Sequence, residues 1–422
     1  MKKLLVLNCF LFLLSGCIST KGGIEKQLNK KLSSPFYDNQ FTGVFIIDAQ
    51  TKDTLYDYSS EKYFTPASNT KIFTLFTALK TLPDSIPALS YLKIKDTTYF
   101  KGTGDPTFLH PYLKDSTALR FLKNQDNLVF VSGSLKDEKY GPGWAWDDYQ
   151  WYYSPERNAL PIHGNVLLAY KNPEFTVKPS YFKDSVLKLL HKTNRDEFKN
   201  IFYYPPHSSD TLETPFITSE KTTVALLEYY LNKKVHTQLT MPAGKPQRLY
   251  GINADSLYIR MMHESDNFIA EQLLLLSAHV LTDTLNSNHI RTHMLESELK
   301  DLAQAPRWVD GSGLSRYNLF TPQNMVAVLH RLYTEIPLER LFRLFPEVEN
   351  TAMPKTNSSM SETPFVYAKS GSLSNNYCLS GYVRTKSGKI LIFSIMNNHF
   401  RQPTVEVRTK LAEMLQNLHN TY

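Results

Sequence analysis

Ser68 and Lys71 lie three residues apart in the stretch TPASNTKIFT, at the head of an apolar run. A serine hydroxyl becomes a useful nucleophile only when a base accepts its proton. A lysine can serve as that base once burial or neighbouring cations lower its pKa. Residues i and i+3 share one face of a helix. The pair therefore has the composition of a nucleophile and its base.

The spacing Ser-x-x-Lys has little value by itself, because it occurs at five other places: Ser59/Lys62, Ser90/Lys93, Ser180/Lys183, Ser185/Lys188 and Ser297/Lys300. Only Ser68/Lys71 stands at the start of a strongly apolar helical pattern, where free backbone N–H groups could also stabilise an oxyanion. The alternative is a helix-capping serine followed by a solvated lysine. Partners elsewhere in the chain must decide between the two.

Ser265-Asp266-Asn267 follows Met-Met-His-Glu in a run with helical periodicity. It offers a second hydroxyl at Ser265 and, at Asn267, an amide that can hold a peptide backbone. The same tripeptide also suits a helix cap or an interhelical turn, so both interpretations stay open.

Lys369-Ser370-Gly371 stands in the extended segment YAKSGSLSNN. Glycine lets a substrate backbone approach a strand edge, while Lys369 supplies positive charge and Ser370 a hydroxyl, a combination that would bind a carboxylate. An identical tripeptide at Lys386-Ser387-Gly388 falls between two β-runs and is interpreted as a turn. The three motifs, in this order and each in a suitable setting, carry more weight than any one of them.

The elements around the motifs alternate between strand and helix patterns. FTGVFIIDAQTKDTLYDYSS predicts two strands around a turn at Gln50–Thr54, which deliver the chain into a buried helix from Thr65 to about Leu82, closed by Pro83. Helical periodicity returns in SLYIRMMHESDNFIAEQLLLLSAHVL. A second hairpin around Lys386–Lys389 precedes a terminal helix from Thr404 to about Leu418. From Pro83 to Pro246 the composition changes to aromatic, Pro- and Gly-rich pieces, which predicts an α/β domain interrupted by a second lobe.

With these motifs the sequence resembles the penicillin-recognising serine acyltransferases, the superfamily of D,D-peptidases and serine β-lactamases. Within it the chain is most similar to the D-alanyl-D-alanine carboxypeptidase/endopeptidase family, the class C low-molecular-mass penicillin-binding proteins. Three further stretches carry this resemblance: KGTGDPTF (101–108), GPGWAWDDY (141–149) and VDGSGLSRYN (309–318). The long interval between Ser68 and Ser265 also fits that family, whose members carry an extra lobe there.

The resemblance implies an α/β (α+β) fold of the β-lactamase/transpeptidase type, with a central antiparallel sheet flanked by helices and an inserted lobe. The domain boundaries expected from it are a lipoprotein signal peptide at 1–16, a tether and first helix at 17–40, a catalytic domain at 41–85 and 245–422, and the inserted lobe at 86–244.

The resemblance also implies roles for the motif residues. Ser68 would attack the carbonyl of the penultimate D-alanine of a peptidoglycan stem peptide, with Lys71 as its base. Ser265, hydrogen-bonded between Lys71 and Lys369, would relay the proton to the leaving D-alanine. The remaining implied roles are peptide binding by Asn267, carboxylate binding by Lys369, Ser370 and Gly371, and an oxyanion hole made by the backbone N–H groups of Ser68 and Ser372.

Asp148, in the Trp-Asp-Asp run, resembles the family's acidic residue that receives the free amino end of diaminopimelate. A turn aspartate is the alternative, and Asp147 is adjacent. Asp105 and Asp310 are interpreted as turn residues that frame the site.

The first residues, MKKLLVLNCFLFLLSGC, have two lysines before a short apolar stretch, which predicts an export signal and not a membrane-spanning helix. Leu14 to Cys17 resembles the lipobox of bacterial lipoproteins, so Cys17 is expected to carry the lipid anchor of an envelope protein facing the periplasm. Cys9 would leave with the signal, and Cys378 alone would remain without a disulfide partner.

The formal net charge of +7 falls by two on removal of Lys2 and Lys3 and forms no basic block, so nucleic acid is not an expected partner. No cofactor or metal is expected, since His289 and His293 lack an accompanying carboxylate motif. β-Lactams are expected as covalent inhibitors. The alternatives are a β-lactamase-like hydrolase and an inactive peptidoglycan-binding lipoprotein that uses its 13% aromatic residues to stack on sugars.

Overall fold

The computed structural model describes residues 21–348 and 364–422, which form two compact units. The first unit takes the described residues of Met1–Phe73, Asp301–Trp308 and Arg316–Tyr422, and the second takes Thr74–Lys300 and Val309–Ser315. The predicted signal peptide and Cys17 lie outside the described residues. The second unit contains the expected inserted lobe and continues to Lys300. The predicted domain boundaries stay a prediction.

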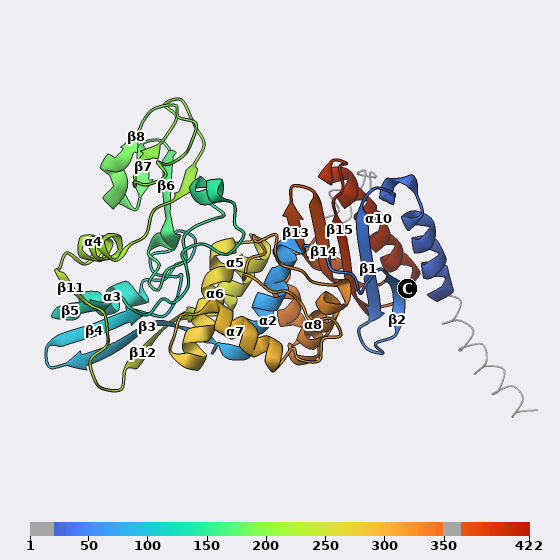
Figure 1. Ribbon diagram of the computed structural model, residues 1–422, viewed down its shortest axis with the longest axis horizontal. Helices are drawn as coiled ribbons and strands as arrows, with labels where there is room; N and C mark the ends of the chain where they lie inside the picture. The colour runs from blue at the N-terminus through green and yellow to red at the C-terminus, as the bar shows by residue number, and fades with distance from the viewer. Residues whose placement is uncertain (1–20, 349–363) are drawn as a thin grey trace, which may run out of the picture. The chain divides into compact units, whose positions relative to one another are not determined.

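The first unit is built on a five-stranded antiparallel sheet with the order β13-β14-β15-β1-β2 (Figure 1). Its strands are β1 (Phe41–Asp48), β2 (Thr54–Tyr58), β13 (Val366–Leu373), β14 (Asn376–Arg384) and β15 (Ile390–Asn398). Both predicted hairpins are confirmed. The sheet order makes β13 an edge strand.

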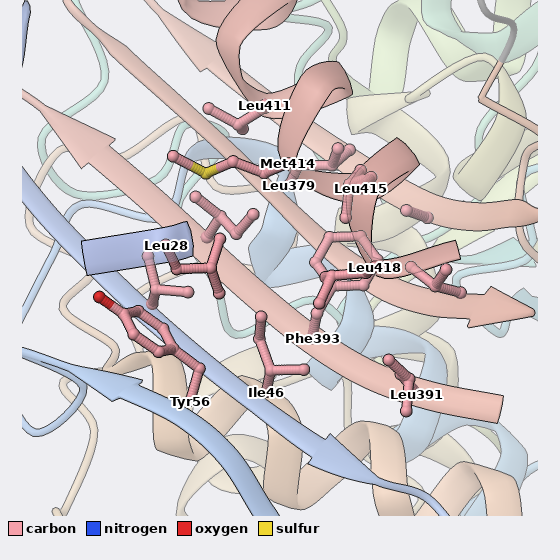
Figure 2. Close-up of a cluster of buried hydrophobic side chains, with 14 of the residues drawn as sticks. Leu28, Ile46, Tyr56, Leu379, Leu391, Phe393, Leu411, Met414, Leu415 and Leu418 are labelled. Carbon is pink, nitrogen blue, oxygen red and sulfur yellow. The ribbon is translucent and has the colours of Figure 1, made fainter. Parts of the chain in front are cut away.

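One face of this sheet is covered by two helices from opposite ends of the chain. They are the N-terminal helix (described residues 21–32) and α10 (Thr404–Thr421), as the sequence predicts. Figure 2 shows Leu28 of the first helix and Leu411, Met414, Leu415 and Leu418 of α10 gathered over the strand residues Ile46, Leu379, Leu391 and Phe393. All are buried, so this cluster forms the core that holds the sheet.

The opposite face of the sheet receives α8 (Pro322–Glu335) and the short 3₁₀ helix η2 (Ala67–Thr70). Side chains of a strand alternate between its two faces. Leu379 of β14 packs in the α10 core, whereas Ser380 bonds to Asn69 of η2 and Tyr382 Oη donates to the Leu329 carbonyl of α8. The face that carries η2 is therefore the face toward which Lys369, paired with Ser380, points. The smaller elements of this unit are η1 (Pro35–Tyr37) and α9 (Leu338–Leu344).

The helix predicted from Thr65 begins later than expected. Residues 67–70 form η2, and α2 runs over Lys71–Thr81. Ala67 has a φ of +50°, a left-handed conformation that a right-handed helix cannot pass through. The predicted end before Pro83 is confirmed. Lys71–Phe73 belong to the first unit and the rest of α2 to the second.

The second unit contains a five-stranded sheet in the order β11-β5-β4-β3-β12, a three-stranded sheet in the order β10-β6-β7 and the pair β8-β9. The larger sheet consists of β3 (Ser85–Ile94), β4 (Thr97–Gly102), β5 (Asn127–Val131), β11 (Val235–Gln238) and β12 (Gln247–Asn253). The smaller pieces are β6 (Val166–Lys171), β7 (Phe175–Lys178), β10 (Leu212–Pro215), β8 (Val186–Leu187) and β9 (Phe202–Tyr203). These short strands agree with the composition of the expected lobe.

Helices of the second unit are α3 (Thr117–Lys123), α4 (Glu220–Leu231), α5 (Asp255–His263), α6 (Asn267–Thr282) and α7 (Ser287–Glu296). Helix α6 is buried along nearly its whole length, as its Leu-rich sequence predicts. Ser265 and Asp266 lie between α5 and α6, so the run with helical periodicity is divided there by an interhelical turn, one of the two interpretations that the sequence left open. Ser265 has a φ of +55°, and this left-handed residue ends the helical path.

Candidate active site

Ser68 and Lys71 are joined by a direct hydrogen bond. Lys71 Nζ donates to Ser68 Oγ over 2.9 Å. Lys71 has no exposed surface, whereas Ser68 is half-buried. Ser68 is thus only partly enclosed, while the Lys71 amine is shielded from water.

The turn that presents Ser68 is strained and closely braced. Ala67 keeps its left-handed φ, a conformation that persists only when surrounding contacts impose it. Thr70 Oγ1 donates to the Ala67 carbonyl over 2.9 Å, and the Asn69 N–H donates to the Pro66 carbonyl over 3.2 Å. These bonds hold the nucleophile just outside the first turn of α2.

Strand β13 carries Lys369 and Gly371 beside this turn. A Cβ added at Gly371 would lie 2.4 Å from the Pro66 carbonyl oxygen and 2.9 Å from the Ser68 nitrogen, so only glycine fits there. Lys369 is 2% exposed, and burial lowers its pKa from the ordinary lysine value to about 8. Strand β13 thus carries Lys369, a buried amine with a lowered pKa, next to the turn that contains Ser68.

Ser370 and Ser372 alternate with Lys369 and Gly371 along β13. Their cross-strand partners are Leu379 and Tyr377, on the α10 face of the sheet. Ser370 is half-buried and Ser372 is exposed. The Ser370 side chain therefore leaves β13 on the opposite face of the sheet from the Lys369 side chain.

Asn69 is a residue that the sequence analysis did not single out. It is completely buried between η2 and the sheet. Its Nδ2 donates to the carbonyls of Lys369 over 2.8 Å and Cys378 over 3.3 Å, and its Oδ1 accepts from Ser380 Oγ over 2.6 Å. The sequence signal for this role was an amide side chain directly after the serine of the Ser-x-x-Lys motif.

Ser265 and Asn267 belong to the second unit, at the junction of α5 and α6. Asp266 caps α6 by accepting from the Ile269 N–H over 3.0 Å and also pairs with Arg260 Nε over 2.9 Å. Asn267 Nδ2 donates to the Tyr153 carbonyl over 3.0 Å. The tripeptide is therefore an interhelical turn and cap, with Ser265 and Asn267 on either side of the capping aspartate.

Asp148 lies in the same unit, in the 3₁₀ helix η3 (Trp146–Gln150). Tyr153 Oη donates to Asp148 Oδ1 over 2.8 Å, and burial together with this bond raises the pKa of Tyr153. Because the carbonyl of Tyr153 also receives Asn267, one residue contacts both Asp148 and Asn267. The neighbouring Asp147 is exposed.

The predicted site residues thus form two groups. Ser68, Lys71 and the β13 segment 369–372 gather in the first unit. Ser265, Asn267 and Asp148 lie in the second, where Tyr153 links Asn267 to Asp148.

The sequence predicted Asp310 as a turn residue, but it did not predict the buried network that joins Glu271 to the loop Asp310–Ser315. Glu271 lies one turn after Asn267 on α6, and its Oε1 accepts from the N–H groups of Gly311 over 2.9 Å and Ser312 over 2.8 Å. Burial, and then the charge of Asp310, raise the pKa of Glu271, while Arg157, 3.5 Å away, opposes that rise. Asp310 itself accepts from the N–H of Gly313, which confirms the predicted turn. A lone buried glutamate in a Leu-rich helix was the available signal.

The described residues give no support for a metal site or a membrane span. Residues 21–348 and 364–422 contain no group of at least three His, Cys, Asp or Glu side chains that could hold a metal ion. His289 and His293 are both exposed on α7. Nor does any helix in this part of the chain combine the length and apolarity needed to cross a bilayer.

A serine bonded to a buried lysine, beside a lysine-bearing strand edge on a mixed α+β scaffold, defines a serine-type hydrolase. The chain belongs to the D-Ala-D-Ala carboxypeptidase 3 (S13) family, whose model matches residues 24–185 and 255–418. It is accordingly a serine-type D-Ala-D-Ala carboxypeptidase. The predicted family resemblance is confirmed.

Two curated proteins illustrate the relationship. The chain is 25% identical over 422 aligned positions, which cover 87% of each protein, to the D-alanyl-D-alanine carboxypeptidase DacB of Haemophilus influenzae. It is 22% identical over 450 aligned positions, covering 89% of this chain and 82% of the relative, to the penicillin-sensitive carboxypeptidase A of Dictyostelium discoideum.

Solved structures show the same fold. Penicillin binding protein 4 (dacB) from Haemophilus influenzae matches with a TM-score of 0.70 and 22% identity, covering 94% of this chain and 98% of the other. The same protein in complex with a novel β-lactam matches with a TM-score of 0.63 and 21% identity over the same shares. The predicted mixed fold with a central antiparallel sheet is therefore confirmed.

Proposed function

We propose that the chain removes the terminal D-alanine from peptidoglycan stem peptides through an acyl-enzyme on Ser68. The observation that carries this proposal is the 2.9 Å hydrogen bond between Lys71 Nζ and the half-buried Ser68 Oγ. An adjacent base and an accessible hydroxyl are what nucleophilic catalysis requires.

In the acylation step, neutral Lys71 accepts the hydroxyl proton while Ser68 Oγ bonds to the carbonyl carbon of the penultimate D-alanine. The backbone N–H groups of Ser68 and Ser372 stabilise the resulting oxyanion. The C–N bond then breaks, and Ser265 passes the proton from Lys71 to the leaving nitrogen. D-Alanine departs with its amine restored.

Deacylation repeats the chemistry with water as the nucleophile. Lys71, neutral again, takes a proton from water as the oxygen attacks the ester carbonyl. The bond to Ser68 Oγ breaks, and the proton returns to the serine. The net reaction is hydrolysis of one peptide bond.

Substrate binding is assigned to charges and hydrogen bonds on both sides of the scissile bond. Protonated Lys369, with Ser370 and Gly371 next to it on β13, takes the terminal carboxylate. Asn267 holds the peptide backbone of the donor. Asp148 pairs with a free amino group on the stem-peptide side chain.

β-Lactams are proposed as covalent inhibitors that acylate Ser68. The β-lactam ring also presents a carbonyl carbon to the serine, but its C–N bond opens without releasing a separate product. The tethered amine stays in the site, so the acyl-enzyme persists. The relative solved with a β-lactam supports this assignment.

The site of action is proposed to be the cell envelope, where D-Ala-D-Ala peptides occur. The lipobox-like Leu14–Cys17 stretch supports a lipid anchor at Cys17. Metabolic labelling with a palmitate analogue tests the anchor. Label on the wild type and on Cys378→Ser, but none on Cys17→Ser, is expected, and label retained by Cys17→Ser would overturn the anchor.

The enzymatic proposal is tested by labelling purified protein with a fluorescent penicillin and by measuring D-alanine release from a D-Ala-D-Ala peptide. Both are expected for the wild type and absent for Ser68→Ala. Rapid penicillin turnover without peptide cleavage would indicate a β-lactamase instead. A folded wild type that takes no label would indicate a binding protein without this chemistry.

A further inference from the structure

We propose that Asn69 is a positioning residue for acylation, whose side-chain amide holds together the two segments that supply the oxyanion hole. This inference rests on the proposed function, since the oxyanion hole is part of it. It assigns to Asn69 no contact with substrate.

The amide of Asn69 is fully engaged. Its two hydrogens go to the carbonyls of Lys369 and Cys378, at 2.8 and 3.3 Å, and its oxygen accepts from Ser380 Oγ at 2.6 Å. Ser380 Oγ also bonds to Ser394 Oγ over 2.8 Å, deeper in the sheet. A donor pair and an acceptor are needed together at this position, and among side chains of this size only an amide offers both.

The amide joins the two segments that carry the proposed oxyanion hole. Asn69 follows the nucleophile directly on η2, and Lys369 lies three residues before Ser372 on β13. Between them, the Cα of Gly371 presses against the Ser68 backbone so closely that a Cβ there would meet the nitrogen at 2.9 Å. The bond from Asn69 to Lys369 therefore fixes the separation of the Ser68 and Ser372 N–H groups.

The sheet order and the conformation of the turn explain why a side-chain link between η2 and β13 is needed. Strand β13 is the last strand of the sheet in the described part of the chain, and its outer side pairs only near Tyr367, with the segment around Glu347, which leaves Lys369–Leu373 beyond that bridge. The Ser68 turn leaves the helical path at Ala67, which has a φ of +50°. The Ser68 turn and β13 have no regular backbone pairing with each other. Each must nevertheless point one N–H donor at the same substrate oxygen, with an accuracy of a few tenths of an ångström. A buried side chain that crosses from one to the other supplies that constraint.

Three variants in this hydrogen-bond network and one control outside it separate positioning from stability. Asn69→Asp keeps the shape but turns the two donor bonds into contacts between a carboxylate oxygen and carbonyls. Asn69→Ala removes them. Ser380→Ala removes the bond to the Asn69 oxygen and the bond to Ser394 Oγ but leaves the link from Asn69 to Lys369 intact. Asn39→Asp, at an exposed asparagine, repeats the charge change away from the site.

The measurements are the acylation rate constant and the non-covalent dissociation constant for a penicillin, together with the infrared stretching frequency of the acyl carbonyl. For Asn69→Ala and Asn69→Asp we expect acylation to slow at least about tenfold, with the dissociation constant changed by less than about threefold. The acyl carbonyl band should move to higher frequency, because weaker hydrogen bonds polarise it less. Ser380→Ala and Asn39→Asp should acylate near the wild-type rate, even where the melting temperature of Ser380→Ala falls.

A folded Asn69→Ala that acylates at the wild-type rate with an unshifted carbonyl band would overturn the proposal. So would a Ser380→Ala that slows acylation equally, or failure of both Asn69 variants to fold, because the amide would then serve folding alone. A wild-type protein that takes no penicillin label would instead remove the proposed function, and this inference with it.

Discussion

Lys71 Nζ bonds to Ser68 Oγ across the boundary between two kinds of helix, a 3₁₀ turn that holds the serine and an α-helix that starts at the lysine. The 3₁₀ turn leaves Ser68 half-buried, while Lys71 at the start of the apolar helix is completely buried. One short segment thus carries both an accessible nucleophile, Ser68, and a base that is shielded from water, Lys71.

Lys71→Ala is expected to fold and to lose acylation by at least roughly a hundredfold, because a positioned general base contributes on that scale. Labelling kinetics with a fluorescent penicillin measure the loss. Lys62→Ala is the matched control, since Lys62 belongs to another Ser-x-x-Lys pair but is exposed. A Lys71→Ala protein that acylates at the wild-type rate would remove Lys71 from the mechanism.

The pH profile should report Lys369. Its pKa is lowered to about 8 by burial, so the amine is charged below that pH and neutral above it. If the charged form binds the terminal carboxylate, kcat/KM for a D-Ala-D-Ala peptide falls as pH rises through about 8. Initial rates at low substrate concentration across neutral and alkaline pH measure this limb.

Lys369→Gln provides the comparison for that profile. It should show a low kcat/KM throughout and lack the alkaline fall that the wild type shows, because glutamine does not titrate. An alkaline fall of the same midpoint in Lys369→Gln would assign the titration to another group.

Glu271 is expected to contribute mainly to stability. Glu271→Ala leaves the N–H groups of Gly311 and Ser312 without their acceptor and removes the carboxylate near Arg157. A loss of about 3 kcal/mol in the free energy of unfolding is expected. Glu271→Gln keeps the acceptor oxygen and should lose clearly less.

Urea unfolding of both Glu271 variants measures these losses. Glu298→Ala is the control, because Glu298 is about half exposed and its 3.2 Å pair with Lys80 should be worth at most about 1 kcal/mol. Equal losses for the Ala and Gln variants would mean that the charge of Glu271, and not its acceptor oxygen, is what stabilises the loop.

Asp148→Asn is expected to reduce kcat/KM by about ten- to a hundredfold for a stem peptide with a free side-chain amine, the scale of one charge-assisted hydrogen bond. The same peptide with that amine acetylated should be cleaved equally by wild type and variant. Asp147→Asn tests the register of the adjacent carboxylates. A greater effect at Asp147 than at Asp148 would reassign the amine contact.

Much of the fold followed from local patterns. The hairpins of β1 with β2 and β14 with β15, the terminal helix α10 and the buried helix α2 were all predicted, because alternation and helical periodicity record which face of each element meets a core. The predicted start of the first buried helix at Thr65 was wrong. It fails at Ala67, a non-glycine residue with positive φ, whose conformation is imposed by contacts and not by local preference.

The motifs, their order and their chemistry were determined by the sequence itself, because residue type decides which side chains can act as nucleophile, base or charge. The tertiary structure alone showed that Asn69 joins η2 to β13, that Gly371 admits the Ser68 backbone, and that Tyr153 links Asp148 to Asn267. These contacts connect residues separated by up to about three hundred positions, and their geometry depends on sheet register and close packing. The sequence pattern contains neither the sheet register nor the packing geometry.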